Sequence, residues 1–484
     1  MSNLKYLKTF FNKSLIIISV GFLSLSSSAL AADTQVSTAT YIGSLAGDSV
    51  NATEFLPSGN IAFGGIVNGS GAVFTTSADG QTILTNFTAG LGATVNDLDL
   101  NRTTGVISAA GSNGLFQIDG NNLMWSKNIG NVLRVGVSAT DGKIAALAQN
   151  GGEICIYNPD GTAVSNCFET EVNTADLAID GNLVYITGYK QVAVDLQQPY
   201  IYAMDFNGNI VYTAYNFDNN QAGDAGFNSE DTSGKRIAIG RDGGLYFLGR
   251  IDGGRNSFTQ NPADITQIAN NVSIDNYTNT SNAGGAKSFT YIAKFNKINL
   301  AHISGQFHVS RMGSGEANSL IGENITADET GNIYVAGTSA GVFFDRNNQT
   351  INGNPVGVYN GLEPIIFAVD NTMTNRLFMT TFTKTGTGTA KGISVSNGTT
   401  SVAIQNLSGE KMVINPNSNV ISGGFYAVFG ILQTQTSSIL PINTPRTGGL
   451  SDYQENNILL ISLFFSLISV ISTLTIVKLR INKN

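Results

Sequence analysis

The stretch Asp328-Glu-Thr-Gly-Asn-Ile-Tyr-Val-Ala-Gly337 decides the fold, because weaker copies of it recur along most of the chain. In each copy, a turn that contains a glycine precedes a run of apolar residues, and a second glycine usually ends that run. A turn followed by a short strand, repeated at intervals, indicates a repeat architecture. The turn glycines of the copies are Gly59, Gly105, Gly142, Gly181, Gly243, Gly331 and, in a weaker copy, Gly398.

The spacing of these copies indicates a β-propeller. The early copies recur about every 40 residues, close to the ~40–45 residues of a four-stranded blade. Each unit supplies one strand before the motif and two after it, as in Tyr200–Phe206 and Ile210–Tyr215 around the turn Asn207–Asn209. We therefore expect an all-β fold, a single propeller over residues 36–432. Seven four-stranded blades are predicted, with six or eight blades as the alternatives.

The last unit is one strand short. It contains Gly392–Ser396, Thr400–Asn406 and Gly424–Ile431, and a polar segment then begins. A spare strand, Ala39–Ser44, precedes the first full unit. Pairing this N-terminal strand with the last blade would close the ring and leave no sheet edge open there.

The opening stretch resembles the bacterial β-propeller repeats with a D-x-x-G-N-x-Y-V-x-G core that occur in secreted surface proteins. The hairpin Tyr202–Tyr212 is similar to the outer strands of those repeats. The resemblance is clear in the middle of the chain and weak in the first three units. It implies a fold, and such repeats carry no fixed catalytic residues.

Three segments lengthen the later units. They are Gln191–Pro199, Ile251–Ser288 and Gly341–Glu363, and each falls between the second and third strands of its unit. Insertions at one position of a repeat emerge on one face of the fold, and that face is often the binding face. We expect these loops to bind a surface protein or a carbohydrate.

Composition limits the function classes. The 484 residues carry a formal net charge of −8 and only 12% charged residues, with no basic patch for nucleic acid. The many tight turns implied by 55 glycines fit a repeat-built β fold. We expect a monomer without cofactors; adventitious calcium on a loop or in the central channel stays open.

The N-terminus has the features of a secretory signal peptide. Lys5, Lys8 and Lys13 precede the apolar run Leu15–Leu25, and small residues follow as far as Ala31. A basic region, a short apolar region and an A-x-A site predict a signal peptide over residues 1–31, cleaved between Ala31 and Ala32. The alternative is an uncleaved membrane anchor.

The C-terminus predicts an anchored, exported chain. Residues 458–477 are uncharged and apolar, long enough to cross a bilayer as a helix. The basic tail 478–484 then stays in the cytoplasm by the positive-inside rule. Residues 433–456 are rich in Thr, Ser, Pro and Gly, and we expect a stalk there.

A short motif in the stalk resembles a sortase sorting signal of the LPxTG family. It consists of Thr444, Pro445, Arg446, Thr447 and Gly448, followed by a second glycine, the apolar span and the basic tail. The resemblance implies a sortase partner, cleavage between Thr447 and Gly448, and attachment to the cell wall. Thr444 stands where the family has Leu, so a plain membrane anchor is the alternative.

Few residues are candidates for catalysis or metal binding. His302 and His308 are the only histidines; they lie six apart on a predicted strand, which would place them on one face. Asp97 and Asp99 alternate on another strand but lack the glycine and terminal glutamate of a calcium loop. No nucleophile elbow, zinc-protease motif or phosphate-binding loop occurs.

The two cysteines leave a disulfide open. Cys155 and Cys167 flank the turn Asn158–Gly161, and a type I turn with Gly161 left-handed would set Cys155 opposite Ser165. Cys167 would then be a diagonal neighbour of Cys155, too distant for a bond without a bulge or another register. The export signal favours pairing, whereas this register opposes it.

The sequence thus predicts a non-enzymatic adhesion or ligand-binding propeller displayed on a cell surface. The alternative is a secreted propeller hydrolase or lyase. Its site would combine acidic residues in the central channel with His302 or His308.

Overall fold

The computed structural model describes residues 33–43, 47–149, 152–171, 173–193, 196–218, 221, 231–252, 257–274, 288–314, 316–343, 346–359, 361–416 and 423–432. The predicted signal peptide, stalk, sorting motif, apolar span and basic tail lie outside these residues. Within the described ranges, no helix is both long and apolar enough to cross a membrane.

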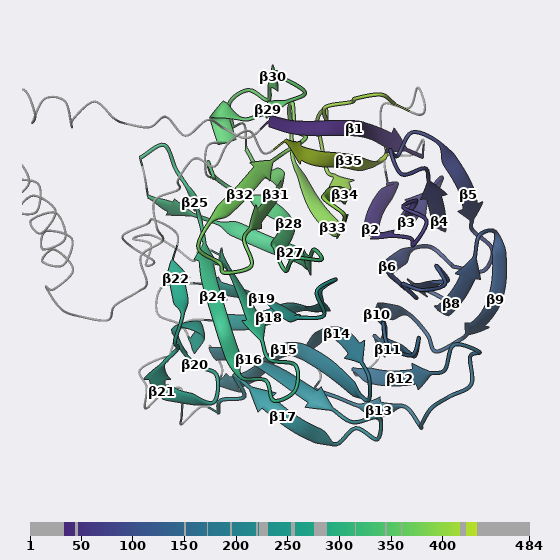
Figure 1. Cartoon of the computed structure of the whole chain (residues 1–484), viewed down its shortest axis with the longest axis vertical. Coiled ribbons are helices and arrows are strands. Elements are labelled where there is room, and N and C mark those ends of the chain that lie inside the picture. The colour runs from purple at the N-terminus through teal and green to yellow at the C-terminus, as the bar shows by residue number, and fades with distance from the viewer. Residues whose placement is uncertain are drawn as a thin grey trace, which may run out of the picture. The chain divides into compact units, whose positions relative to one another are not determined.

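Seven antiparallel sheets of four main strands surround a central axis in the described part of the chain (Figure 1). Blades 1 to 3 comprise β2 (Ser49–Phe55), β3 (Ile61–Val67), β4 (Ser70–Thr76) and β5 (Ile83–Phe87); β6 (Val95–Leu100), β7 (Ile107–Gly111), β8 (Gly114–Asp119) and β9 (Asn122–Lys127); β10 (Val132–Val137), β11 (Ile144–Ala148), β12 (Glu153–Tyr157) and β13 (Phe168–Glu169). Blades 4 to 6 comprise β14 (Thr174–Asp180), β15 (Leu183–Ala193), β16 (Leu196–Met204) and β17 (Ile210–Ala214); β18 (Asp231–Ile239), β19 (Leu245–Asp252), β23 (Ser288–Phe295) and β24 (His302–His308); β27 (Leu320–Ala327), β28 (Ile333–Ser339), β31 (Glu363–Val369) and β32 (Arg376–Thr380). The predicted all-β propeller of seven blades is confirmed.

Blade 7 closes the ring in the predicted way. It comprises β33 (Gly388–Ser396), β34 (Thr399–Asn406), β35 (Gly424–Leu432) and, as its outermost strand, the N-terminal β1 (Asp33–Ile42). Strand β1 pairs antiparallel with β35 along its whole length, from Asp33 opposite Leu432 to Ile42 opposite Gly424. It is longer than the predicted strand and begins six residues earlier, because Asp33 to Thr38 also find partners on β35 and on an insertion.

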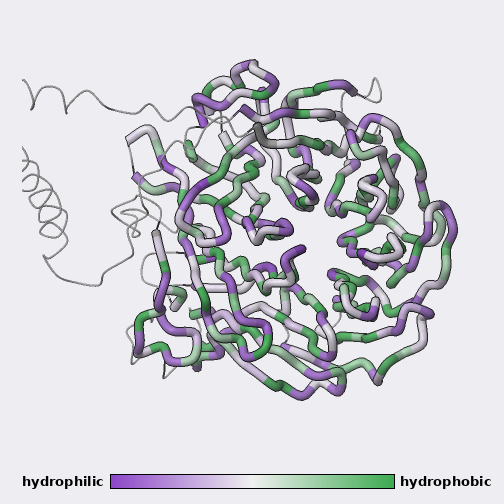
Figure 2. Tube along the Cα trace, viewed as in Figure 1, coloured by the Kyte–Doolittle hydropathy of each residue, from purple (hydrophilic) through white to green (hydrophobic). Residues whose placement is uncertain are grey.

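The hydrophobic core lies between neighbouring blades. One cluster joins Phe63 and Phe74 of blade 1 to Tyr426 and Val428 of blade 7, and similar clusters fill the other junctions. In Figure 2 hydrophobic stretches lie within the blades, and hydrophilic stretches recur at the turns between strands. Each blade therefore buries its apolar faces against the next blade rather than in a central core.

The turn glycine of the repeated motif has one conformation in every blade. It lies between the first and second strands of its blade, and all seven copies have a positive φ between 58° and 84°. In the opening stretch the carboxylate of Asp328 accepts hydrogen bonds from the backbone N–H groups of Thr330 and Asn332, each at 2.9 Å. Gly331 supplies the left-handed position that this turn requires.

Every innermost strand contains a β-bulge at the same place. The ladder with the second strand shifts at Val50/Ala52, Val95/Asp97, Val132/Arg134, Thr174/Asp176, Gly234/Arg236, Gly322/Asn324 and Ala390/Gly392. A bulge bends the strand and redirects the side chain that follows it. The second glycine of the motif lies opposite this bulge, as Gly337 lies opposite Gly322.

Replacing Gly337 with alanine is expected to destabilise the domain by about 1–3 kcal/mol, the usual cost of overpacking. A Cβ at this position would lie 2.1 Å from the carbonyl oxygen of Ile321. Gly313→Ala is the matched control, since a Cβ there meets nothing within 4 Å, and it should leave the stability unchanged. Urea unfolding checks both variants, and equal midpoints would contradict this account of the motif.

The insertions cover sheet edges. In blade 5 the insertion contains η1 (Ser257–Thr259), β20 (Gln260–Asn261), β21 (Asp264–Ile268) and β22 (Val272–Ile274), and β22 pairs with the outer edge of β24. In blade 6 it contains η2 (Arg346–Asn348), β29 (Thr350–Ile351) and β30 (Asn354–Pro355), and β29 pairs with the outer edge of β1. The short hairpin β25 (Ser310–Arg311) and β26 (Ala317–Asn318) connects blades 5 and 6.

The segment Gln191–Pro199 differs from the prediction. It is a lengthened hairpin, because β15 and β16 stay paired as far as Ala193 opposite Leu196. It therefore extends blade 4 rather than forming an irregular loop.

Candidate functional site: central channel and insertion face

The propeller has two faces with different connections. Because neighbouring strands are antiparallel, first-to-second and third-to-fourth connections emerge on one face, here called the turn face. Second-to-third and blade-to-blade connections emerge on the other, here called the insertion face, which carries the insertions of blades 5 and 6. The loop after β34 in blade 7 is also a second-to-third connection and lies on the insertion face.

The innermost strands surround a small, charged central cavity. Its volume is about 90 Å³, enough for roughly half a dozen water molecules. Its charged lining residues come from blades 1, 2, 4 and 5 and are Glu54, Asp97, Asp99, Arg102, Asp176 and Arg236. Asp97 and Asp99 stand out in the sequence by their alternation, whereas the arginines do not, although each lies directly after a bulge or near the following turn.

Charges of alternating sign follow the bulges of four successive blades. Asp97, Arg134, Asp176 and Arg236 occupy this position in blades 2 to 5. The guanidinium of Arg236 donates to Asp176 at 3.3 Å and lies 3.9 Å from Asp97. It also donates to the carbonyl of Glu323 at 2.9 Å, so one buried side chain links blades 2, 4, 5 and 6.

The same carboxylates hold the backbones of neighbouring blades. Asp176 accepts the N–H of Ile237 at 2.9 Å, and Asp97 accepts the N–H of Val135 at 3.3 Å. Burial raises the pKa of Asp97, and Arg236 opposes this shift. These contacts link the carboxylates to backbone and cationic groups in one buried network within the ring.

Two arginines cross the channel near the turn face. Arg102 of blade 2 donates to the carbonyls of Ile239 and Gly240 in blade 5, at 3.0 and 3.1 Å. Arg241 of blade 5 donates to the carbonyl of Phe55 in blade 1 at 3.3 Å. Their side chains obstruct this end of the cavity.

Glu54 and Asp99 form an acidic pair beneath these arginines. Asp99 accepts the N–H groups of Val137 at 2.6 Å and Leu100 at 2.7 Å, and Glu54 accepts the hydroxyl of Ser394 at 2.9 Å. Burial, reinforced by the charge of Glu54, raises the pKa of Asp99 to about 7. Burial also raises the pKa of Glu54, against the effect of Arg241 and Arg102.

This raised pKa predicts that Asp99 makes stability depend on pH. The folded state holds the proton more tightly than the unfolded state, whose Asp99 has a pKa of 3.8. Its contribution is therefore fully present below pH 4 and is lost as the pH rises to about 7. In Asp99→Asn, urea unfolding between pH 4.5 and 7.5 should show a shallower loss of stability than in the wild type. Parallel pH profiles would contradict the assignment.

The histidines lie away from the channel and on opposite faces of β24, so the prediction that they share a face was wrong. Lys294 pairs with Ser304 but Phe295 pairs with His302, and this bulge reverses the alternation of side chains. The ring of His302 lies 3.1 Å from the hydroxyl of Tyr291, and His308 packs on Phe367 towards blade 6. Burial lowers the pKa of His302 to about 4 and that of His308 to about 3. Both imidazoles therefore remain neutral at physiological pH.

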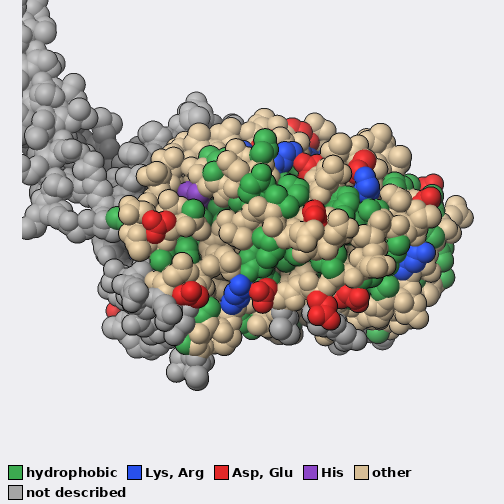
Figure 3. Space-filling model, turned by 90° about the horizontal axis from the view of Figure 1, so that it is seen from below, with side chains coloured by type: hydrophobic (Ala, Val, Ile, Leu, Met, Phe, Trp, Pro, Cys, Tyr) green, Lys and Arg blue, Asp and Glu red, His purple; other side chains and the backbone are tan. Residues whose placement is uncertain are grey.

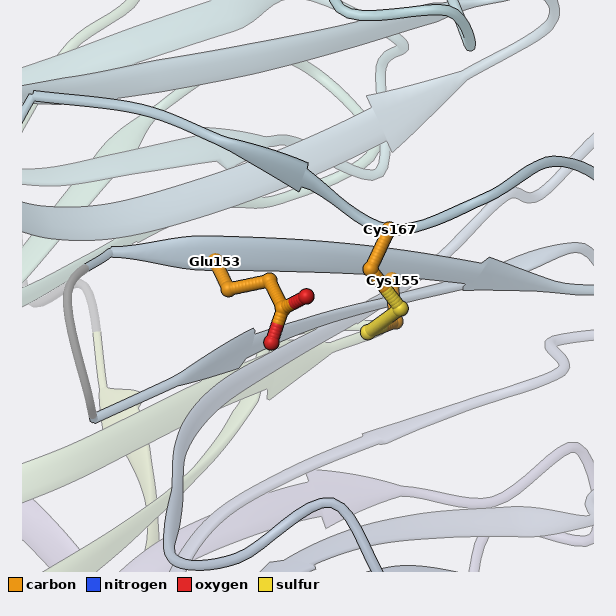
Figure 4. A group of neighbouring side chains, drawn as sticks. All are labelled: Glu153, Cys155 and Cys167. Atoms are coloured by element: carbon orange, nitrogen blue, oxygen red, sulfur yellow. A yellow bond between two sulfur atoms is a disulfide. The ribbon is translucent and has the colours of Figure 1, made fainter.

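The cysteines are joined in a disulfide at the outer edge of blade 3 (Figure 4). The turn has the expected form, since Gly161 has a φ of 83° and Tyr157 pairs with Ala163. Further along, however, Ile154 pairs with Phe168, so the register has shifted and Cys155 comes opposite Cys167, with Cα atoms 4.3 Å apart. The bond secures the two-residue strand β13.

Glu153 lies beside this disulfide, and its carboxylate is within 4.8 Å of both sulfur atoms (Figure 4). A disulfide offers no thiolate to a metal. In the described part of the chain no other group of three metal-ligating side chains comes as close together. The disulfide therefore holds the edge strand β13 against β12.

The part of the blade 6 insertion that leads into β31 is fixed on the insertion face by a buried ion pair. The guanidinium of Arg346 donates to both carboxylate oxygens of Glu363, at 2.5 and 2.9 Å, and both side chains are at least 97% buried. Arg346 also donates to the carbonyl of Gly357. Above this ion pair the insertion exposes Val358 by 74% and Leu362 by 48%.

Blade 7 adds an apolar residue to the same area. The N–H of Gly388 donates to the carbonyl of Leu362, and the neighbouring Thr387 accepts the N–H of Leu407. Leu407 is 59% exposed. We call Val358, Leu362 and Leu407 the insertion-face apolar group.

Exposed apolar side chains also occur on the rim. Strand β17 exposes Ile210, Val211 and Tyr212, and it lies on the side of the ring that Figure 3 shows. Hydrophobic side chains are visible there between scattered charges (Figure 3). Exposed apolar side chains are common on protein surfaces.

Comparison with known proteins supports a propeller repeat. The family model SBBP, described as a beta-propeller repeat, matches residues 313–344, which include β27, the whole opening stretch and β28. No curated protein matches the chain. The match and the seven-bladed ring together show a β-propeller repeat protein.

Proposed function

We propose that this propeller is a non-enzymatic binding module, exported and displayed on a cell surface, that engages its ligand with the insertion face. The observation that carries the proposal is that the insertion-face apolar group lies at the opposite strand ends from Asp33 and Leu432, although β29 of the blade 6 insertion also reaches Asp33. The third strand of each blade runs towards the turn face, so β35 ends there at Leu432, beside Asp33 at the start of β1. An anchor that follows residue 432 would therefore continue from the turn face.

The predicted segments outside the described residues agree with this orientation. A signal peptide over 1–31 would end just before Asp33, and a stalk over 433–456 would start just after Leu432. The sorting-like motif Thr444–Gly448 and the apolar span 458–477 would then attach the chain to the wall or the membrane. Mass spectrometry of the mature C-terminus tests the anchor: an end at Thr447 supports a sortase, and an end at Asn484 refutes it.

The insertion face offers a rigid surface for binding. The Arg346–Glu363 ion pair fixes the blade 6 insertion, and β29 adds its pairing with β1. A preorganised surface loses little conformational entropy when a ligand binds. The insertion-face apolar group supplies contact area. The exposed Asn347, whose side-chain oxygen accepts the N–H of Tyr359 next to Val358, can donate its amide N–H groups to a ligand.

The alternative, a hydrolase or lyase in the central channel, has weaker support. Its carboxylates converge there, but Arg236, Arg102 and Arg241 pair with them or obstruct the cavity. The cavity of about 90 Å³ is small against the ~300–1,000 Å³ of most ligand pockets. Both histidines lie elsewhere, on the outer strand β24.

A binding screen tests the proposal. The chain is displayed on cells and probed with arrays of glycans and of surface proteins. We expect saturable binding to at least one class, with no turnover of the bound molecule. Release of a product with multiple turnover would instead support the channel hydrolase.

A further inference from the structure

A second pocket lies on the turn face, between blades 1 and 2. Its volume is about 220 Å³, larger than the central cavity. Leu56, Pro57 and Ile107 form its apolar lining. Asn60 and Asp119 supply polar groups at its edge. It is thus separate from the insertion face and from the channel.

The pocket lies where the two following blade junctions each have an aromatic side chain that covers the turn. At the next junction Trp125 of blade 2 covers the turn of blade 3: a Cβ on Gly161 would lie 2.9 Å from its ring, and its indole N–H donates to the carbonyl of Pro159. At the junction after that, Phe168 covers Gly208 in the same way.

Blade 1 has a small residue at the corresponding position. Trp125 pairs with Gln117, and the corresponding pair in blade 1 is Thr85 with Thr75. A Cβ on Gly120, in the turn that an aromatic ring would cover, meets nothing within 4 Å. No ring fills this space here; the side chain of Asn121 reaches across beside it, where its amide oxygen accepts the N–H of Asn86 at 3.1 Å.

Asp119 differs from the carboxylates in the matching turns of other blades. Asp79, Asp160, Asp205 and Asp370 each accept a backbone N–H within their own turn. The side chain of Asp119 makes no such bond among the described residues. The side-chain amide of Asn60 is likewise uncommitted there, so both remain available to a ligand.

We propose that this pocket binds one neutral sugar ring of a glycan. A ring-sized space with an apolar wall suits the C–H face of a pyranose. Asp119 can accept two hydroxyl donors, and the amide of Asn60 can both donate and accept. A carboxylate at the edge disfavours anionic ligands, and 220 Å³ leaves room for little more than a single ring.

Saturation-transfer NMR with the full chain tests the site. The chain is kept in a zwitterionic detergent without a sugar headgroup, and the probes are methyl glycosides of glucose, galactose and N-acetylglucosamine. We expect saturable binding of at least one glycoside, weakened at least fivefold by Asp119→Ala and by Asn60→Ala. Asp205→Asn, in the matching turn of blade 4, is the control and should bind like the wild type.

A filling variant separates loss of the site from loss of the fold. Thr85→Trp should place an indole in the pocket as Trp125 does at the next junction, and should abolish binding without lowering the unfolding temperature. The proposal is overturned if no glycoside binds, or if Thr85→Trp folds and binds as the wild type does. Binding of N-acetyl-lysine methylamide in place of the glycosides would also overturn it, in favour of a basic peptide ligand.

Discussion

Deleting residues 33–42 is expected to prevent the domain from folding as a closed ring. The deletion removes β1, whose Val36, Ala39, Tyr41 and Ile42 are buried between blades 6, 7 and 1. Burial of a large apolar side chain contributes about 1.5–3 kcal/mol. The loss then approaches the ~5–15 kcal/mol total stability of a domain. It would also leave β35 as an open edge.

Circular dichroism and size-exclusion chromatography measure the result. We expect aggregation or a large fall in the unfolding temperature, and partial rescue by a synthetic peptide of residues 33–43. Gln35→Ala is a mild control, because among the described residues this partly buried side chain bonds to Asp33 alone. A truncated chain as stable as the wild type would show that the ring closes without β1.

Arg236→Met is expected to destabilise the folded domain by about 3–5 kcal/mol, the usual result of removing one partner from a buried ion pair. The side chains of Arg236 and Asp176 are 8% and 7% exposed. Without the guanidinium, the buried charges of Asp176 and Asp97 lose their nearest cation. Arg134 remains 3.5 Å from Asp176, and both carboxylates keep their backbone bonds.

Two further variants isolate this effect in urea unfolding. Arg250→Met is the control, because its pair with Asp252 is about one-third exposed and should contribute at most about 1 kcal/mol. Combining Arg236→Met with Asp97→Asn and Asp176→Asn should recover much of the loss, since asparagine keeps an acceptor without the charge. If the triple variant is no more stable than Arg236→Met alone, uncompensated charge is not the cause.

The blade count and the ring closure could be predicted because both depend on local signals. The seven turn glycines mark the turn between the first and second strands of every blade, and the surplus of one strand at the N-terminus required pairing with the last unit. The same count of strands placed the insertions between the second and third strands of their blades.

The bulges explain what the sequence did not predict. Strict alternation placed His302 and His308 on one face, but the extra residue in β24 separates them. A shift between the turn and β13 likewise brings Cys155 opposite Cys167. Arg134 and Arg236 could not be assigned to the channel from the sequence, because the bulge before each of them sets the direction of its side chain. A shift of one or two residues in register has no strong signature in composition or periodicity.

The role of the insertion face is tested most directly by comparing two variants against the ligand that the screen identifies. One carries Val358→Asp, Leu362→Asp and Leu407→Asp; the other is the channel variant Arg236→Met with Asp97→Asn and Asp176→Asn. Binding is measured by titration on cells after both variants are shown to be folded. We predict at least a tenfold loss of affinity in the first variant and unchanged affinity in the second. Unchanged binding in the first with loss in the second would contradict the account and place the ligand in the channel.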